Sequence, residues 1–272
     1  MRKKILEPLL SLGFFVSGYI YPSLQAELTG LSFGIAGILL LDLIEYLIKE
    51  RSFLKLYWDC HKPFTGSEIR LTIAYLFRIE VNGKYLLVKS HRIDNTFQPV
   101  GGVYKYFNPE AKLQLDCMGA ITDNKIGNDN ISECDLRLNL TDRKKIGKFL
   151  KWFFNAKNRE CDPWREFYEE LIGPGILPAK EFPYMHYILV GQHFEPIHND
   201  PFFNVDTFKY ADIYVPTFIT ARQTDAVYYL ASHESSEYIW VTQREINQGI
   251  SDGGHRIAEH SHKIFHNKFL HQ

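Results

Sequence analysis

The stretch Arg165-Glu-Phe-Tyr-Glu-Glu-Leu171 decides how this chain is interpreted. Read as a helix, it places Glu166, Glu169 and Glu170 within an arc of about 100° on one face. Three carboxylates at this spacing repel one another unless a cation lies among them. Their hard oxygen atoms suit Mg²⁺, so the stretch predicts a metal site at these three glutamates. The alternative is a solvated acidic face on an amphipathic helix.

The composition excludes several classes of protein. The 31 Lys and Arg residues balance 32 Asp and Glu residues, so the net charge does not favour DNA as a partner. The 4 cysteines form no Cys-x-x-Cys pair, which argues against a structural zinc site and against a disulfide framework. We therefore expect the soluble part of the chain to lie in a reducing cytoplasm.

Two apolar stretches near the N-terminus have the length of membrane spans. Residues 5–21 and 28–48 each approach the roughly 20 residues that a helix needs to cross about 30 Å of hydrocarbon. Lys and Arg flank the pair at its outer ends and are absent from the turn at residues 22–27. By the positive-inside rule, we expect both ends of the pair in the cytoplasm. A cleaved signal peptide and a buried hairpin of a soluble core are the alternatives.

A mixture of strands and helices is predicted after the apolar stretches. Asn82-Gly83 predicts a tight hairpin turn, and residues 143–155 carry apolar side chains at helical spacing. Asp162-Pro163 predicts the start of the helix that carries the glutamates, and Gly173 predicts its end. Further strands are predicted at residues 69–80, 84–89, 184–190, 213–218 and 226–230, and short helices at residues 242–247 and 256–265. The pattern indicates an α+β fold on a mixed or mostly antiparallel sheet.

These residues resemble the signature of Nudix domains, whose box reads G-x5-E-x7-R-E-U-x-E-E-x-G-U. The segment from Arg165 to Glu170 matches the second half of the box, and Gly101 and Gly102 resemble the glycines that open it. The resemblance implies an α/β/α domain with a mixed sheet. It also implies that Glu166, Glu169 and Glu170 are catalytic and hold Mg²⁺ against a diphosphate, while Arg165 orients them by ion pairing.

The chain departs from the box in its first half. Asn108 stands where the box has its first glutamate, and 62 residues separate Gly102 from Arg165. We interpret residues 108–160, with approximate bounds, as an insertion in the box. A site that lacks one ligand and carries a long insertion favours nucleotide binding over hydrolysis, so the enzymatic activity stays open.

The order of the segments is similar to that of the SMODS-associated Nudix effectors of bacterial CBASS antiphage systems. In such systems an oligonucleotide cyclase makes a cyclic nucleotide on infection, and the effector binds it, damages the membrane and kills the cell. The resemblance implies two transmembrane helices within residues 1–56, in the bacterial inner membrane, and a cytoplasmic Nudix-like domain at residues 60–272. It also implies homo-oligomers that contact membrane lipid, with a cyclase as the functional partner.

The candidate ligand contacts combine cations for phosphate, an aromatic face for a base and the glycines of the turn: Arg92, Gly101, Gly102, Tyr104, Lys105 and Arg165. A different interpretation is a membrane-anchored, Mg²⁺-dependent hydrolase of a nucleoside diphosphate derivative. A third is a scaffold that uses the fold only to recruit partners.

Overall fold

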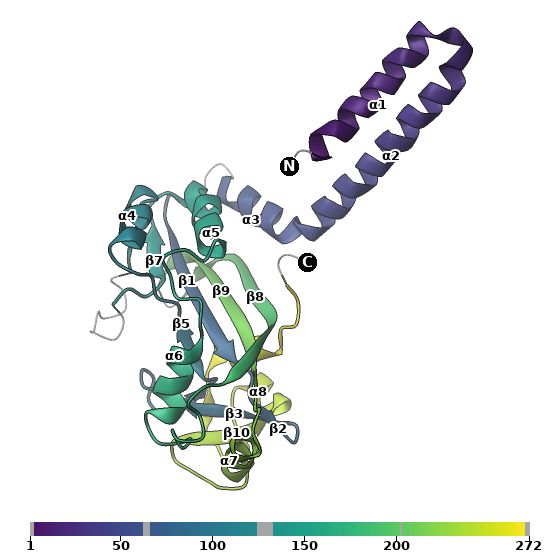
Figure 1. The fold of residues 1–272 in the computed structure, drawn as a ribbon. Coiled ribbons are helices and arrows are strands. Elements are labelled where there is room, and N and C mark those ends of the chain that lie inside the picture. Colours follow the sequence, from purple (N-terminus) through teal and green to yellow (C-terminus); the bar gives the residue numbers. More distant parts are fainter. Residues whose placement is uncertain (1–2, 62–65, 124–132, 202, 270–272) are drawn as a thin grey trace. The chain divides into compact units, whose positions relative to one another are not determined.

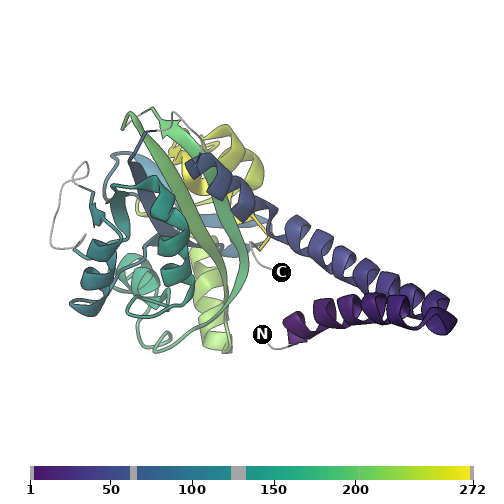
Figure 2. The same ribbon diagram turned by 90° about the horizontal axis from the view of Figure 1, so that it is seen from above.

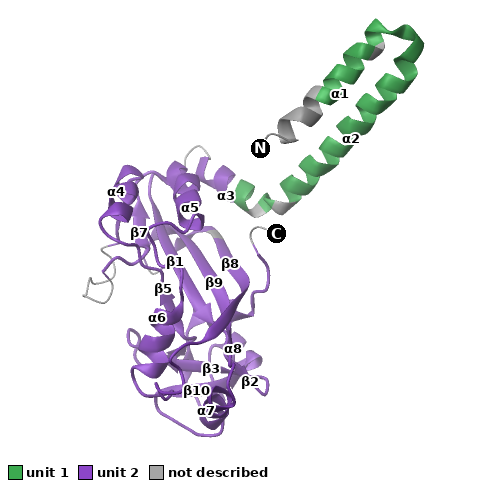
Figure 3. Cartoon of the chain, in the orientation of Figure 1, with its two compact units in different colours: residues 1–55, 270–272 green, residues 56–269 purple. Residues whose placement is uncertain are grey.

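The computed structural model describes residues 3–61, 66–123, 133–201 and 203–269. It divides the chain into two compact units, with residues 3–55 in one and residues 56–269 in the other (Figure 3). Arg2, one of the cations that flank the first apolar stretch, lies outside the described residues, as does part of the predicted insertion, residues 124–132. The division into a membrane domain at residues 1–56 and a Nudix-like domain at residues 60–272 stays a prediction.

The first unit is helical. Helix α1 (Lys3–Ile20) and helix α2 (Gln25–Lys49) are joined by a 3-10 turn, η1 (Pro22–Leu24). The turn predicted at residues 22–27 is therefore shorter than expected, because α2 begins at Gln25.

Serine hydroxyls join α1 to α2. The hydroxyl of Ser11 donates to the carbonyl of Ser32 at 3.0 Å, and the hydroxyl of Ser32 donates to the carbonyl of Ser11 at 2.9 Å. The rings of Phe15 and Phe33 meet edge to face beside this contact. Because both serines bond to backbone, the two helices approach closely at this level.

One helical segment of the first unit, Pro22–Ile48, is long and apolar enough to cross a membrane, with a mean hydropathy of 2.0. It contains the predicted span at residues 28–48 and is the one segment among the described residues that meets this criterion. Residues 5–21 fall in α1 and the turn after it. Whether they form a second span, and how the chain is oriented in a membrane, stays a prediction.

Helix α3 (Arg51–His61) follows α2 after the single residue Glu50. Leu56 and Cys60 of α3 are buried, whereas Tyr57 and Trp58 are exposed. The helix is therefore amphipathic, with aromatic side chains on its exposed side.

The second unit is built on two mixed sheets, which Figures 1 and 2 show from two directions. In the larger sheet the strand order is β6-β7-β1-β9-β8, with β5 also paired to β1; β1 and β9 run parallel and the other pairs antiparallel. In the smaller sheet the order is β10-β3-β4-β11, with β2 paired to β3. The strands are β1 (Ile69–Phe77), β2 (Glu80–Val81), β3 (Lys84–Lys89), β4 (Thr96–Gln98), β5 (Gly101–Val103), β6 (Ala120–Thr122), β7 (Arg137–Leu140), β8 (His186–Asp200), β9 (Val205–Thr217), β10 (Tyr238–Thr242) and β11 (Arg256–Ile257). The α+β fold and the mixed sheet predicted from the sequence are confirmed.

Short helices surround the sheets. Figure 1 shows α4 and α5 beside β7, and α7 and α8 beside the smaller sheet. The helices are α4 (Glu110–Cys117), η2 (Arg143–Lys145), α5 (Ile146–Phe154), α6 (Trp164–Phe167), η3 (Tyr168–Ile172), α7 (Ala221–Ala231), α8 (Gln243–Gln248) and η4 (Glu259–Phe265). The described part of the predicted insertion adds β6 and β7 to the larger sheet, since β7 pairs with β1.

Two predictions of local structure are wrong. Residues 226–230 form part of helix α7 rather than a strand, because Thr220 caps the helix and Gln223, Val227 and Leu230 are buried at helical spacing. Residues 256–265, predicted as one helix, form the strand β11 followed by the 3-10 helix η4, because Ala258 between them is extended. The hairpin turn at Asn82-Gly83 is confirmed, with positive φ at both residues.

The hydrophobic core between the two sheets fixes the place of β5. Leu76 and Ile213 of the larger sheet pack in one cluster with Leu87 and Val241 of the smaller sheet. Leu76 is also the pairing partner of Gly101 in β5. Gly101 and Gly102 at the start of β5, named the glycine turn below, are therefore held directly against β1, on the side where α6 lies (Figure 1).

Candidate functional site

The helix that carries the glutamates starts and ends as predicted, but its middle is not a regular α-helix. Asp162 accepts a hydrogen bond from the backbone N–H of Trp164 at 2.8 Å at its start. After α6 the chain makes a π-helical turn, η3, in which the N–H of Gly173 reaches the carbonyl of Tyr168 at 2.7 Å. π-helical turns are rare and occur often at functional sites. Within this turn, the side chain of Glu170 is buried and that of Glu169 is exposed.

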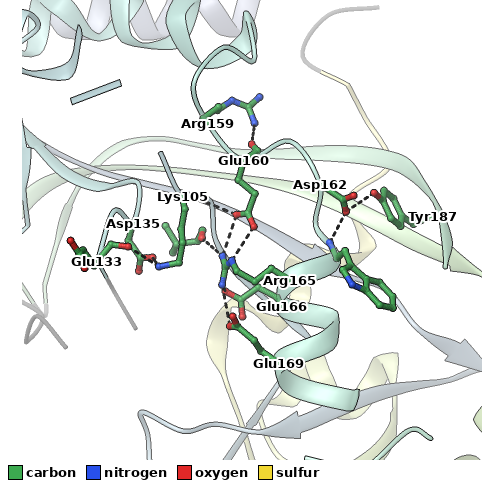
Figure 4. Close-up of polar contacts among 12 residues, drawn as sticks. Lys105, Glu133, Asp135, Arg159, Glu160, Asp162, Arg165, Glu166, Glu169 and Tyr187 are labelled. Atoms are coloured by element: carbon green, nitrogen blue, oxygen red, sulfur yellow. Dashed lines mark hydrogen bonds and ion pairs between the residues drawn. The ribbon is translucent and has the colours of Figure 1, made fainter. Parts of the chain in front are cut away.

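A guanidinium lies among the carboxylates where the sequence predicts a metal ion. Arg165 donates from Nε to Glu160 Oε1 at 2.9 Å and from Nη1 to Glu166 Oε1 at 2.6 Å, and Nη1 also contacts Glu169 Oε2 at 3.2 Å (Figure 4). Its Nη2 donates to the carbonyl of Val103 at 3.0 Å. Burial opposes the charged form, but the hydrogen bonds to Glu160 and the charge of Glu166 raise the pKa of Arg165. Arg165 therefore forms ion pairs with Glu166 and Glu169, and its role in orienting them, which the Nudix resemblance implies, stays a prediction.

The glycine turn contacts two of the glutamates. The N–H of Gly101 donates to Glu170 Oε2 at 2.8 Å. A Cβ on Gly102 would lie 1.9 Å from Glu166 Oε1, so only a glycine permits this approach of the carboxylate. Gly101 has a φ of 147° and its backbone passes so close to β1 that a Cβ would meet the carbonyl oxygen of Tyr75 at 2.3 Å. Gly101 and Gly102 thus join β1 to the glutamate helix.

Glu170 is buried and its neighbour Glu166 is partly buried, and the pKa of both is raised. Burial and then the charge of Glu166 raise the pKa of Glu170 to about 8. Burial also raises the pKa of Glu166, in spite of the charge and hydrogen bond of Arg165. Burial of a carboxylate disfavours its charged form, and a second carboxylate nearby adds to the effect.

The oxygen atoms of this cluster are of the kind that Mg²⁺ prefers. In the arrangement described, however, Glu166 and Glu169 are bound to Arg165, and Glu170 is bound to the N–H of Gly101. Among the residues that the structure describes, no group of three His, Cys, Asp or Glu side chains is placed to hold a metal ion. The side chains as they stand suit a guanidinium, and a metal would require Glu166 or Glu169 to leave Arg165.

A second charged group adjoins the first. Lys105 Nζ lies 3.1 Å from Asp135 Oδ1, and Arg137 Nη1 lies 3.5 Å from Asp135 Oδ2. Burial raises the pKa of Asp135 to about 6, against the charges of Lys105, Arg92 and Arg165. Because all three cations act on this one carboxylate, Arg92 and Lys105 lie on the same side of the domain as Arg165.

Tyr104 lies in the core rather than on the surface. It is 1% exposed, its hydroxyl donates to Asp212 at 2.6 Å, and the rings of Tyr75 and Phe153 pack against it at 4.7 Å and 5.4 Å. Arg159 lies over its ring as well, at 5.0 Å. The aromatic face that the sequence offers for a base is therefore covered by neighbouring side chains, which corrects the picture of Tyr104 as an exposed contact.

Sequence reasoning missed Glu160, which contacts Arg165 at two positions where Glu166 and Glu169 each contact it at one. Both of its oxygens bind the guanidinium, and Oε2 also accepts the N–H of Lys105 at 3.2 Å. Glu160 lies five residues before Arg165, at the end of the segment interpreted as an insertion. In place of the glutamate missing at Asn108, the chain thus supplies a carboxylate to Arg165 from another position.

The structure brings most of the predicted site residues into one region around the glycine turn. They are Gly101, Gly102, Arg165, Glu166, Glu169 and Glu170. Lys105 adjoins them through Glu160, whereas Arg92, at the edge of this region, acts through its charge on Asp135. The roles of these residues in catalysis, metal binding or ligand binding stay predictions.

Comparison with known proteins identifies the family of the second unit. The family model of the SMODS-associated NUDIX domain matches residues 68–265, which is most of the chain and nearly all of the second unit. Among curated proteins, no sequence matches this chain. An association with SMODS implies, in general terms, a role beside a cyclase in nucleotide signalling. The chain belongs to the SMODS-associated NUDIX domain family.

Proposed function

We propose that the protein is a membrane effector of a bacterial CBASS antiviral system. Its Nudix-like domain binds a cyclic oligonucleotide made by a partner cyclase, and binding triggers membrane disruption and cell death. The observation that carries the proposal is the combination in one chain of an SMODS-associated NUDIX domain with an apolar helical segment of membrane-spanning length, Pro22–Ile48.

The charges around Asp135 support an anionic ligand. Arg165 is already bound by Glu160, Glu166 and Glu169, so its charge is largely neutralised within the protein. Three cations surround the buried carboxylate of Asp135: Lys105, Arg92 and Arg137. Lys105 Nζ also donates to the carbonyl of Glu133 at 2.7 Å, a contact that leaves its positive charge in place. We infer that Lys105 and Arg92 contact the ligand phosphates, and that Arg165 holds the glycine turn and the glutamate helix in place.

Ligand binding in the Nudix-like domain is coupled to the membrane helices through the equilibrium between two states of the protein. A ligand shifts an equilibrium only when it binds one state more tightly than another. In our proposal the favoured state is a homo-oligomer in which the helices α1 and α2 of several copies contact each other and the lipid. Both helices cross the inner membrane, with both ends and the Nudix-like domain in the cytoplasm, as the flanking Lys and Arg residues favour.

Dye release from liposomes that carry the full-length protein tests this function. We expect one member of a panel of cyclic di- and trinucleotides to cause release. The variant Lys105→Gln should need a higher ligand concentration, because it loses a charge-assisted contact to phosphate. The matched control Lys180→Gln removes a lysine whose side chain is 82% exposed and pairs with its neighbour Glu181, and should behave as the wild type. No ligand-dependent release across the panel would refute the proposal.

A Mg²⁺-dependent hydrolase of a nucleoside diphosphate derivative is the second candidate. It is favoured by the negative charge of Glu166 close to the buried Glu170, since a cation would relieve the repulsion between the two carboxylates. Glu166, Glu169 and Glu170 would hold the ion, which would polarise the phosphate and activate water. Turnover that requires Mg²⁺ and is lost in Glu169→Gln supports this candidate; wild-type signalling by that variant, without turnover in either protein, excludes it.

A further inference from the structure

Helix α3 has a buried face and an exposed face that carries aromatic side chains. Leu56 and Cys60, which belong to the second unit, are buried, whereas Tyr57 is 54% and Trp58 69% exposed. At 100° per residue, Leu54 and Trp58 lie roughly opposite Leu56 and Cys60. Contiguous exposed apolar surface marks sites of contact with proteins or membranes.

Cations border the exposed aromatic face. Arg51 and Lys55 lie next to Trp58 on the helical wheel and are both exposed. The acid of this helix, Asp59, is half-buried and already engaged in an interaction. An exposed aromatic face beside Lys and Arg is the composition of helices that lie in the headgroup region of a bilayer.

Covalent connection places α3 beside the end of the apolar segment. The hydrogen-bonded backbone continues from α2 through Glu50: its N–H donates to the carbonyl of Tyr46, and its own carbonyl accepts from Leu54, both at 2.9 Å. The apolar segment ends at Ile48. Since each helical residue advances about 1.5 Å, Arg51 and Lys55 lie only about 5 to 10 Å along the chain beyond that end.

We propose that α3 lies on the membrane surface, with Tyr57 and Trp58 in the headgroup region and Arg51 and Lys55 on the phosphates of anionic lipids. The proposal rests on the membrane insertion of α2 that the proposed function includes. It adds a second contact of this chain with the bilayer, in the very helix whose other face packs into the Nudix-like unit. A change in that unit therefore has a route to the lipid through α3.

Fluorescence of Trp58 in the full-length protein tests the proposal. The protein is reconstituted in vesicles of zwitterionic lipid with or without anionic lipid, and the signal of Trp58 is obtained by subtracting the spectrum of Trp58→Phe. Nitroxide groups are placed on the lipid near the headgroup in one preparation and at the bilayer centre in another. We expect a large loss of the Trp58 signal with the headgroup label and a small loss with the central label.

Charge variants separate lipid from other partners. Lys55→Glu should reduce the quenching by the headgroup label in anionic vesicles more than in zwitterionic vesicles, whereas the exposed control Lys180→Glu should change neither. A Trp58 signal that is quenched by aqueous acrylamide and by neither lipid label overturns the proposal, as does shielding from all three quenchers, which indicates a protein partner. Quenching by the headgroup label without ligand-dependent dye release would refute the proposed function and leave this contact standing; the reverse result would refute the contact alone.

Discussion

The carboxylate of Glu160 should contribute more to the stability of the folded protein than that of Glu169, although Glu169 belongs to the sequence motif and Glu160 does not. Glu160 binds Arg165 through both oxygens and also accepts the N–H of Lys105. Its side chain is 10% exposed, whereas that of Glu169 is 46% exposed and meets Arg165 at one contact of 3.2 Å. The variants Glu160→Gln and Glu169→Gln therefore form a matched pair with the same chemical change.

The structure sets the size of the two effects. A hydrogen bond to a charged group contributes about 1.5–3 kcal/mol, and the amide introduced by Glu160→Gln would also direct N–H donors toward Arg165 or the N–H of Lys105. We expect Glu160→Gln to cost about 2–3 kcal/mol of unfolding free energy. An exposed pair contributes roughly 0–0.5 kcal/mol after screening by solvent, which is our expectation for Glu169→Gln. At about 2–4 °C per kcal/mol for a domain of this size, the Tm should fall by about 4–12 °C in the first variant and by less than about 2 °C in the second.

Thermal unfolding of the detergent-solubilised full-length chain measures both changes. Tryptophan emission is a suitable signal because Trp164 directly precedes Arg165 in α6. Equal losses of Tm in the two variants, or a larger loss in Glu169→Gln, would refute the assignment of Glu160 as the principal partner of Arg165.

Two further predictions concern the glycine turn and the buried glutamate. Gly102→Ala should destabilise the protein by about 1–3 kcal/mol, because its Cβ displaces Glu166 from the 2.6 Å contact with Arg165. The control Gly147→Ala, in a helix and with nothing within 4 Å of the added Cβ, should stabilise the protein by about 0.5–1 kcal/mol. A change of Tm in the same direction in both variants would contradict this account. Because the pKa of Glu170 is raised from 4.5 to about 8 in the folded state, the folded state binds the extra proton between these values, and stability is lost as pH rises through this window by up to about 1.4 kcal/mol per pH unit. Glu170→Gln should remove this loss, so its Tm should gain on that of the wild type from pH 5 to pH 8, roughly the pKa window; parallel pH profiles would show that Glu170 is not the group responsible.

Local signals in the sequence were sufficient for the elements that frame the site. Asp162-Pro163 predicts the start of the glutamate helix because a capping carboxylate and a proline both favour that position, and Asp162 does accept the N–H of Trp164. The turn at Asn82-Gly83 was predicted for a similar reason, since both residues tolerate positive φ. The proximity of the glycines to the glutamates came from the resemblance to the Nudix box.

The details that decide the chemistry depend on tertiary contacts. Glu160 meets Arg165 at a spacing of five residues that no regular helix predicts, and it does so because the chain folds back before α6. The π-helical turn that accompanies the burial of Glu170 breaks the helical periodicity from which a common acidic face was inferred. Tyr104 is covered by Phe153, which comes from the inserted segment, so its burial could not be read from the neighbouring residues.

The most direct test of the central claim is the binding of cyclic oligonucleotides to the purified full-length protein, measured by titration calorimetry in detergent. The account predicts that one member of a panel of cyclic di- and trinucleotides binds. It also predicts that Lys105→Gln weakens this binding by about 10- to 100-fold, the equivalent of one charge-assisted contact, while Lys180→Gln leaves it unchanged. Folded wild-type protein that binds no member of the panel, or that binds one equally well in Lys105→Gln, would contradict the account.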